Sequence, residues 1–165
     1  DKETHPEYQR IPVNYGNQPS IQTAHVFNYL GRPDLSQYWV RQVVDSAFSG
    51  LSPATGYNGD EDQGLMGSLA VLLKIGLFQM NGGTDANPVY EVTSPVFDKV
   101  TIELNPDFYP GKQFVISTTK QSGDDDFYIH NMKLNENLLD GFTLKHTDVT
   151  SGGKLEIEVS NKPNK

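Results

Sequence analysis

The sequence contains no cysteine, and this absence excludes a disulfide framework, a thiolate zinc site and a cysteine nucleophile. A chain without cysteine tolerates oxidising and reducing surroundings alike, so the compartment stays open. Basic side chains are also scarce: 13 Lys and Arg stand against 21 Asp and Glu, which gives a net charge of −8. Because neutralising phosphates requires clustered Lys and Arg, we expect no nucleic-acid partner.

Long apolar runs are missing as well. The longest, Leu69 to Phe78, is interrupted by Lys74 and is far shorter than the about 20 residues that a membrane-spanning helix needs. We therefore expect no membrane span. The chain starts at Asp1, without an initiator Met or a signal-like segment, which leads us to expect a piece of a longer protein.

What the chain does contain is enough apolar and aromatic surface for a folded core. The hydrophobic fraction is 36%, with 8 Tyr and 8 Phe. This composition argues against disorder, and the length of 165 residues fits one domain or two small packed pieces.

The first half of the chain predicts helices. Pro19 opens a helix of about three turns that ends at Gly31. The segment Asp34-Leu35-Ser36-Gln37 has the spacing of a capping box and starts a second helix, which ends at Gly50. A third helix, roughly Gln63 to Ile75, is apolar nearly all round and should be deeply buried. Three such helices cannot bury themselves well alone, which is typical of the end of a larger helical domain.

The second half changes to an alternating pattern with Pro-, Gly- and Asn-rich turns. It predicts six strands, near Val89–Val92, Lys99–Leu104, Gln113–Thr118, Phe127–Leu134, Gly141–Lys145 and Lys154–Val159. Such short strands favour an antiparallel sandwich. The predicted fold class is α+β: a helical segment over residues 1–80 followed by a small antiparallel β-sandwich over residues 81–165.

An acidic cluster between two glycines, Gly59-Asp60-Glu61-Asp62-Gln63-Gly64, lies directly ahead of the third helix. In an extended segment, Asp60 and Asp62 would point to one side and Glu61 away from it. A convergent carboxylate pair can activate water, bind a metal or bind sugar hydroxyls. The alternative is structural, because aspartates before a helix are common as N-caps and as favourable charge at the helix dipole.

Several motifs, taken in order along the chain, carry a family resemblance. They are Gly16-Asn17-Gln18-Pro19-Ser20, Phe27-Asn28-Tyr29 with Gly31 and Pro33, Gln37 with Val40-Arg41, the acidic cluster 59–64, Ser94-Pro95-Val96-Phe97, Tyr128-Ile129, Lys133-Leu134-Asn135 and Gly152-Gly153-Lys154-Leu155. Together they resemble the C-terminal part of glycoside hydrolase family 92, the calcium-dependent inverting α-mannosidases. The resemblance implies the last helices of an (α/α)6 barrel and a short β region behind them.

The resemblance also implies roles for individual residues. Asp62 would be the catalytic base and Asp60 would assist it, while Asn17, Gln18 and Glu61 would bind substrate. The general acid of the family is a Glu upstream of the Gly16 motif, and no matching segment exists in this chain. The chain would thus hold half of a two-carboxylate site and be inactive alone.

Further expectations follow from the same resemblance. The function implied is exo-acting, inverting hydrolysis of α-mannosidic linkages. The partners would be a mannose-containing glycan and the remaining N-terminal part of the same polypeptide. Ca²⁺ would be the cofactor, with its ligands unassigned, and the location would be periplasmic or secreted in a bacterium.

Departures from the family pattern leave two other functions open. A segment that is His-Glu-Pro or Asn-Glu-Pro in many α-1,2-acting members is Asn17-Gln18-Pro19 here, so its charge is lost. The family's usual His just after it is replaced by Ile21 or Gln22. The alternatives are a non-catalytic carbohydrate-binding β domain with a helical adaptor, and a structural interaction domain whose acidic loop only caps a helix.

Overall fold

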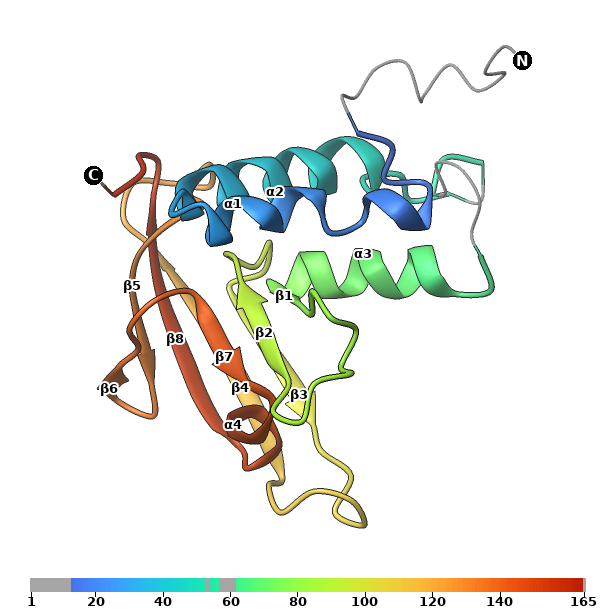
Figure 1. Cartoon of the computed structure of the whole chain (residues 1–165). Helices are drawn as coiled ribbons and strands as arrows, with labels where there is room; N and C mark the ends of the chain where they lie inside the picture. Colours follow the sequence, from blue (N-terminus) through green and yellow to red (C-terminus); the bar gives the residue numbers. More distant parts are fainter. Residues whose placement is uncertain (1–12, 53, 57–61, 165) are drawn as a thin grey trace.

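The computed structural model describes residues 13–52, 54–56 and 62–164. Helices occupy the N-terminal part and lie along one end of the β region (Figure 1). In chain order they are the 3-10 helices η2 (Gln18–Ser20) and η3 (Thr23–His25) and the α-helices α1 (Val26–Tyr29), α2 (Pro33–Ala47) and α3 (Leu65–Ile75), with α4 (His146–Thr150) near the C-terminus.

The first helix differs from the prediction. Instead of three regular turns, the chain forms η2, η3 and the single turn α1, and it ends in a left-handed Gly31 with φ 70°. One cause is visible at Ala24, whose N–H donates to the Tyr15 hydroxyl at 2.7 Å rather than to a carbonyl one helical turn back. A tertiary hydrogen bond therefore replaces a local one, which the sequence pattern could not reveal.

The capping box predicted at Asp34 is wrong. Helix α2 begins at Pro33, with Arg32 in the N-cap position and no side-chain cap. Proline suits the first helical position because its φ is fixed and its missing N–H would have no partner there. Asp34 instead accepts hydrogen bonds from the Arg32 guanidinium, at 2.9 and 2.7 Å.

Helix α3 is buried on one face rather than all round. Met66, Leu69 and Leu73 are almost fully buried, whereas Val71 is 59% exposed. In this chain the helix therefore packs through one face, and its opposite face stays exposed. Glycines bound the helix at both ends, Gly64 before it and Gly76 after it.

The strands form two sheets. The first has the order β1-β2-β7, made of β1 (Leu77–Phe78), β2 (Val89–Val92) and β7 (Thr143–Lys145). The second has the order β3-β4-β8-β5-β6, made of β3 (Lys99–Glu103), β4 (Gln113–Lys120), β8 (Gly153–Ser160), β5 (Tyr128–Leu134) and β6 (Asn137–Leu138). The α+β class is confirmed, and each of the six predicted strands is present.

One pairing departs from the antiparallel prediction. Strand β8 inserts between β4 and β5, and it runs parallel to β4 with Phe114 opposite Gly153, while it is antiparallel to β5. The second sheet is therefore mixed. The sequence also missed β1, β6 and α4, which are too short to show a period.

Two apolar cores meet at β1. One core lies among the helices and includes Phe78, and the other lies between the sheets and includes Leu77. Because neighbouring side chains of a strand point to opposite faces, β1 places one residue in each core. Phe78 pairs with Glu91 on β2, so these two side chains share the face toward the helices.

Two polar side chains of α2 fasten the helices to the β region. The buried Gln37 accepts the backbone N–H of Ile129 at 2.8 Å, across 92 positions of sequence. Arg41 donates to the Ser94 hydroxyl at 3.2 Å and to the Pro95 carbonyl at 3.1 Å, and it lies over the Phe127 ring. Burial lowers the pKa of Arg41. Several motifs that carry the family resemblance thus meet in one structural junction.

Candidate active site

Asp62 lies in a tight turn at the N-terminal end of α3. Its φ is 54°, and Gln63 and Gly64 follow at 60° and 95°, so three successive residues are left-handed. The Asp62 carbonyl accepts the N–H of Leu65 at 3.3 Å, which closes the turn onto the helix. A left-handed non-glycine residue costs about 1 kcal/mol or more, and such strain is typical of functional sites.

The extended geometry assumed from the sequence is not found at Asp62. The left-handed turn ends the alternation on which the convergence of the two aspartates was argued. Asp60 and Glu61 lie outside the described residues, so the structure does not place them. What it shows is a half-buried Asp62 at the start of an apolar helix.

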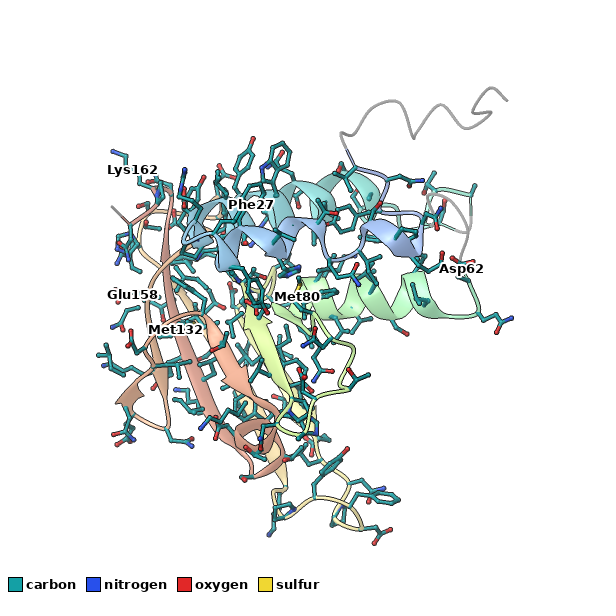
Figure 2. The ribbon with its side chains drawn as sticks, viewed as in Figure 1. Phe27, Asp62, Met80, Met132, Glu158 and Lys162 are labelled. Atoms are coloured by element: carbon teal, nitrogen blue, oxygen red, sulfur yellow. The ribbon has the colours of Figure 1, made fainter. Side chains whose placement is uncertain are left out.

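An open cavity of about 670 Å³ lies in front of Asp62. Its walls come from three stretches of chain, which are Ile21 and Gln22 ahead of η3, residues 62–72 of the turn and α3, and residues 78–82 after β1. Asp62 is at one end of α3 and Met80 is beside the other, so the cavity runs along the helix (Figure 2). Its lining includes both polar and apolar groups.

Of the other residues predicted to bind substrate, Asn17 and Gln18 are described, and neither is part of the cavity lining. Asn17 precedes η2 and Gln18 begins it, and both are exposed. The carbonyl of Gln18 accepts the N–H of Ile21 at 3.3 Å, so the turn that carries Gln18 leads directly into the wall of the cavity. Gln22, which the sequence analysis noted only as a departure, is the polar residue of that wall.

His25 supports the same wall from behind. It is 1% exposed and stacks on the Phe78 ring with centroids 4.3 Å apart and planes 9° from parallel. Burial lowers the pKa of His25 to about 3, so the imidazole is neutral at physiological pH. Its Nδ1 has no hydrogen-bond partner among the residues that the structure describes. His25 is therefore a packing residue of this wall.

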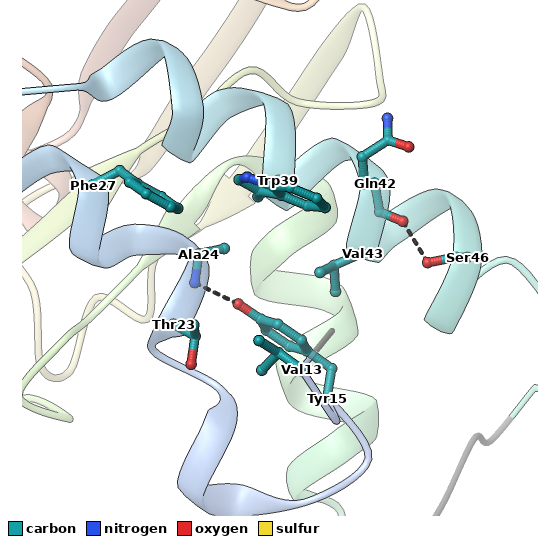
Figure 3. Close-up of a pocket in the computed structure, with 9 residues that line it drawn as sticks. All are labelled: Val13, Tyr15, Thr23, Ala24, Phe27, Trp39, Gln42, Val43 and Ser46. Atoms are coloured by element: carbon teal, nitrogen blue, oxygen red, sulfur yellow. Dashed lines mark hydrogen bonds between the residues drawn. The ribbon is translucent and has the colours of Figure 1, made fainter. Parts of the chain in front are cut away.

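A second, smaller cavity of about 230 Å³ lies on the other side of the η3–α1 run. Tyr15, Ala24, Phe27, Trp39 and Val43 are among the residues that line it (Figure 3). Burial raises the pKa of Tyr15 to about 12, and its hydroxyl is engaged by Ala24. Among the described residues, this lining is mostly apolar, and Tyr15 is its one ionisable side chain.

Glu91 is a buried carboxylate that the sequence analysis missed. It is 3% exposed and accepts hydrogen bonds from the Asn28 amide at 2.5 Å and the Tyr29 hydroxyl at 2.9 Å. The signal was present, because a lone charge lies between Tyr90 and Val92 in a short apolar strand. The pKa of Tyr29 is raised by desolvation and then by its hydrogen bond to Glu91.

The ligands of the implied calcium ion are not identified by a cluster of ionisable side chains in the described part of the chain. Within residues 13–52, 54–56 and 62–164 there is no group of three or more His, Asp or Glu side chains that could hold a metal ion. Asp124 pairs with Lys120, and Asp126 accepts the N–H of Ser122, so the acidic turn 124–126 is occupied with internal contacts.

Comparison with known proteins decides the family. The glycosyl hydrolase family 92 catalytic domain matches residues 1–161. The chain belongs to this family. Among the described residues, no helix is both long enough and apolar enough to cross a membrane.

Relatives of this family 92 chain extend well beyond it. An uncharacterised secreted glycosidase of Arthroderma benhamiae is 30% identical over 147 residues, which cover 87% of this chain and 18% of that protein. A family GH92 α-mannosidase of Bacteroides thetaiotaomicron in complex with mannoimidazole superposes with a TM-score of 0.79 at 25% identity, over 91% of this chain and 18% of that one.

A family GH92 inverting mannosidase of the same bacterium superposes with a TM-score of 0.75 at 33% identity, over 90% of this chain and 19% of that one. The chain therefore spans about a fifth of the length of these relatives. The recognition of family 92 from the sequence motifs is confirmed, and so is the fold class.

Proposed function

We propose that this chain is the C-terminal part of an exo-acting α-mannosidase that hydrolyses α-mannosidic linkages of glycans with inversion. The observation that carries the proposal is the position of Asp62, in a strained turn before an open cavity, in a chain of family 92. The similarity to an inverting mannosidase over 90% of the chain supports it. We assign residues 1–80 to the end of the catalytic barrel and residues 81–165 to a β-sandwich-like domain.

In this proposal Asp62 is the catalytic base and Asp60 assists it. The base takes a proton from the water that attacks the anomeric carbon, on the face opposite the leaving oxygen. Inversion needs a general acid about 6.5–9.5 Å away, so that the water fits between the two carboxyl groups. That acid would come from the remaining N-terminal part of the polypeptide, and the isolated chain would be inactive.

The other assignments follow from the shape of the cavity and its surroundings. We assign the amides of Asn17, Gln18 and Gln22 to hydroxyls of a mannose-containing glycan, and the position of Gln22 in the lining and of Asn17 and Gln18 on the turn ahead of it supports this assignment. Glu61 is assigned to substrate by resemblance alone. The resemblance implies Ca²⁺, but the described residues do not provide a complete site, and no step is assigned to the ion.

A periplasmic or secreted location is part of the same proposal. It is supported by the relative from Arthroderma benhamiae, which is described as secreted.

The experiment that tests the function follows the stereochemistry of the product. The complete protein is incubated with an aryl α-mannoside, and the first-formed anomer is recorded by proton NMR. We expect β-mannose to appear first and α-mannose to follow by mutarotation. Release of α-mannose first would contradict inversion, and hydrolysis of another α-glycoside with none of the mannoside would contradict the substrate.

A further inference from the structure

The Glu91 carboxylate connects the β region to the residues that lead to the cavity. It lies on β2 opposite Phe78, on the face toward the helices, and both of its oxygens accept hydrogen bonds. The donors, Asn28 and Tyr29, form the last turn of the run that begins at η2. Removing one partner from a buried polar contact is costly, because the other group then loses its hydrogen bond without regaining water.

The run 17–31 depends on such contacts for its position. Its pieces η2, η3 and α1 contain three, three and four residues, and helices this short are marginal by themselves. Besides its packing on α2, the run is held by the Tyr15 hydroxyl at Ala24, the stack of His25 on Phe78, and the Glu91 carboxylate at its C-terminal end. Glu91 accepts two hydrogen bonds from this run, one from Asn28 and one from Tyr29.

The opposite end of the same run lines the cavity in front of Asp62, through Ile21 and Gln22. Asp62 directly precedes α3, and the buried α3 residues Met66, Leu69 and Leu73 share a core with α2, so α3 also has contacts outside the run. A change at Glu91 should therefore move one wall of the cavity and leave the proposed base in place.

We propose that Glu91 is a positioning residue, which sets the Ile21–Gln22 wall of the cavity through Asn28 and Tyr29 and thereby governs substrate affinity. The inference rests on the proposed function for the reaction that it affects. It assigns to Glu91 no contact with substrate.

The test begins with Glu91→Ala in the complete protein. KM for the α-mannoside should rise about tenfold while kcat stays within about threefold, because the wall moves and Asp62 does not. For Glu91→Gln, KM should stay within about threefold of the parent's value. The Gln carbonyl can still accept from Tyr29, and the Asn28 amide can turn so that its oxygen accepts from the new Gln. Glu158→Ala is the matched control. Glu158 lies on β8 of the second sheet and accepts a hydrogen bond from Gln121, so its substitution should change neither KM nor kcat.

A double-mutant cycle separates positioning from simple destabilisation. If Glu91 acts through the wall, introducing Glu91→Ala into a protein that already carries Gln22→Ala should raise KM by less than about a further twofold. Additive effects of the two substitutions would overturn the proposal.

Hydrogen exchange gives a readout that does not need activity. Glu91→Ala should speed exchange over residues 17–31 at least about tenfold and leave residues 65–75 unchanged. Unchanged exchange over 17–31 would overturn the inference even in a protein that cleaves no mannoside. Failure of the parent to hydrolyse α-mannosides would instead count against the proposed function.

Discussion

Acid should destabilise the fold through His25, and the size of the effect follows from its burial. The unfolded-state pKa of a histidine is 6.5, and burial lowers that of His25 to about 3. Between these values the unfolded chain binds a proton that the folded chain does not, so the free energy of unfolding falls as pH falls. At pH 5 the difference from the unfolded pKa is about 1.5 units, which corresponds to about 2 kcal/mol at 1.36 kcal/mol per unit.

The perturbation that isolates this contribution is His25→Phe. A phenyl ring preserves the stack on Phe78 and removes the titrating nitrogen atoms, including an Nδ1 without a partner in the described structure. Urea unfolding of both proteins at pH 8 and pH 5, followed by circular dichroism, gives four free energies. We subtract the free energy of unfolding of the parent from that of the variant. This difference should be about 2 kcal/mol larger at pH 5 than at pH 8.

Comparing the pH dependence of the two proteins cancels the contributions of all other groups that titrate in this range, because both proteins contain them. Parallel pH profiles for the parent and His25→Phe would refute the reasoning, because they would show that His25 is protonated in the folded protein or reaches solvent. A benefit of Phe that is equal at both pH values would indicate better packing alone.

Two further predictions concern the junction and a glycine. Gln37→Ala leaves the buried N–H of Ile129 without its acceptor and should lower the free energy of unfolding by about 2 kcal/mol in a urea titration. Gln121→Ala, which removes the hydrogen bond to Glu158, should change it by less than about 0.5 kcal/mol. Gly31→Ala, at φ 70° with open space around it, should cost about 1 kcal/mol. Gly76→Ala should cost several times more by the same assay, because the new Cβ would clash with the Thr93 carbonyl; equal costs would contradict the packing described here.

Much of the β region could be predicted from local pattern. Leu155, Ile157 and Val159 alternate with charged residues, and these apolar positions are the ones buried in β8. The partner of β8 could not be predicted in this way. Parallel pairing with β4 depends on where α4 and the preceding strand lead the chain, and no residue in β8 records that path.

The helical part shows the opposite limit. The pattern over 19–31 is helical, yet the Tyr15 hydroxyl takes the Ala24 N–H and the run breaks into short turns. The sequence marks Gln37 and Arg41 as parts of a family motif, but only the structure shows that they bind the backbone of a β-strand and of a loop. Tertiary contacts determine both outcomes.

The candidate site was predicted in part. Glycine-flanked carboxylates ahead of an apolar helix predicted a functional turn, and the structure shows Asp62 in a left-handed turn before a cavity. The chemical roles of Asp62, Asp60, Glu61, Asn17 and Gln18 stay predictions. The role inferred for Glu91 depends on contacts 62 and 63 positions away in sequence, which no local pattern contains.

The most direct measurement of the central claim is the activity of Asp62→Asn in the complete protein, with Asp107→Asn on an exposed loop as the control. Loss of a general base should lower kcat/KM for α-mannosides by about 10²–10⁴-fold, with the thermal unfolding curve unchanged. Activity within a few-fold of the parent would show that Asp62 is not the base.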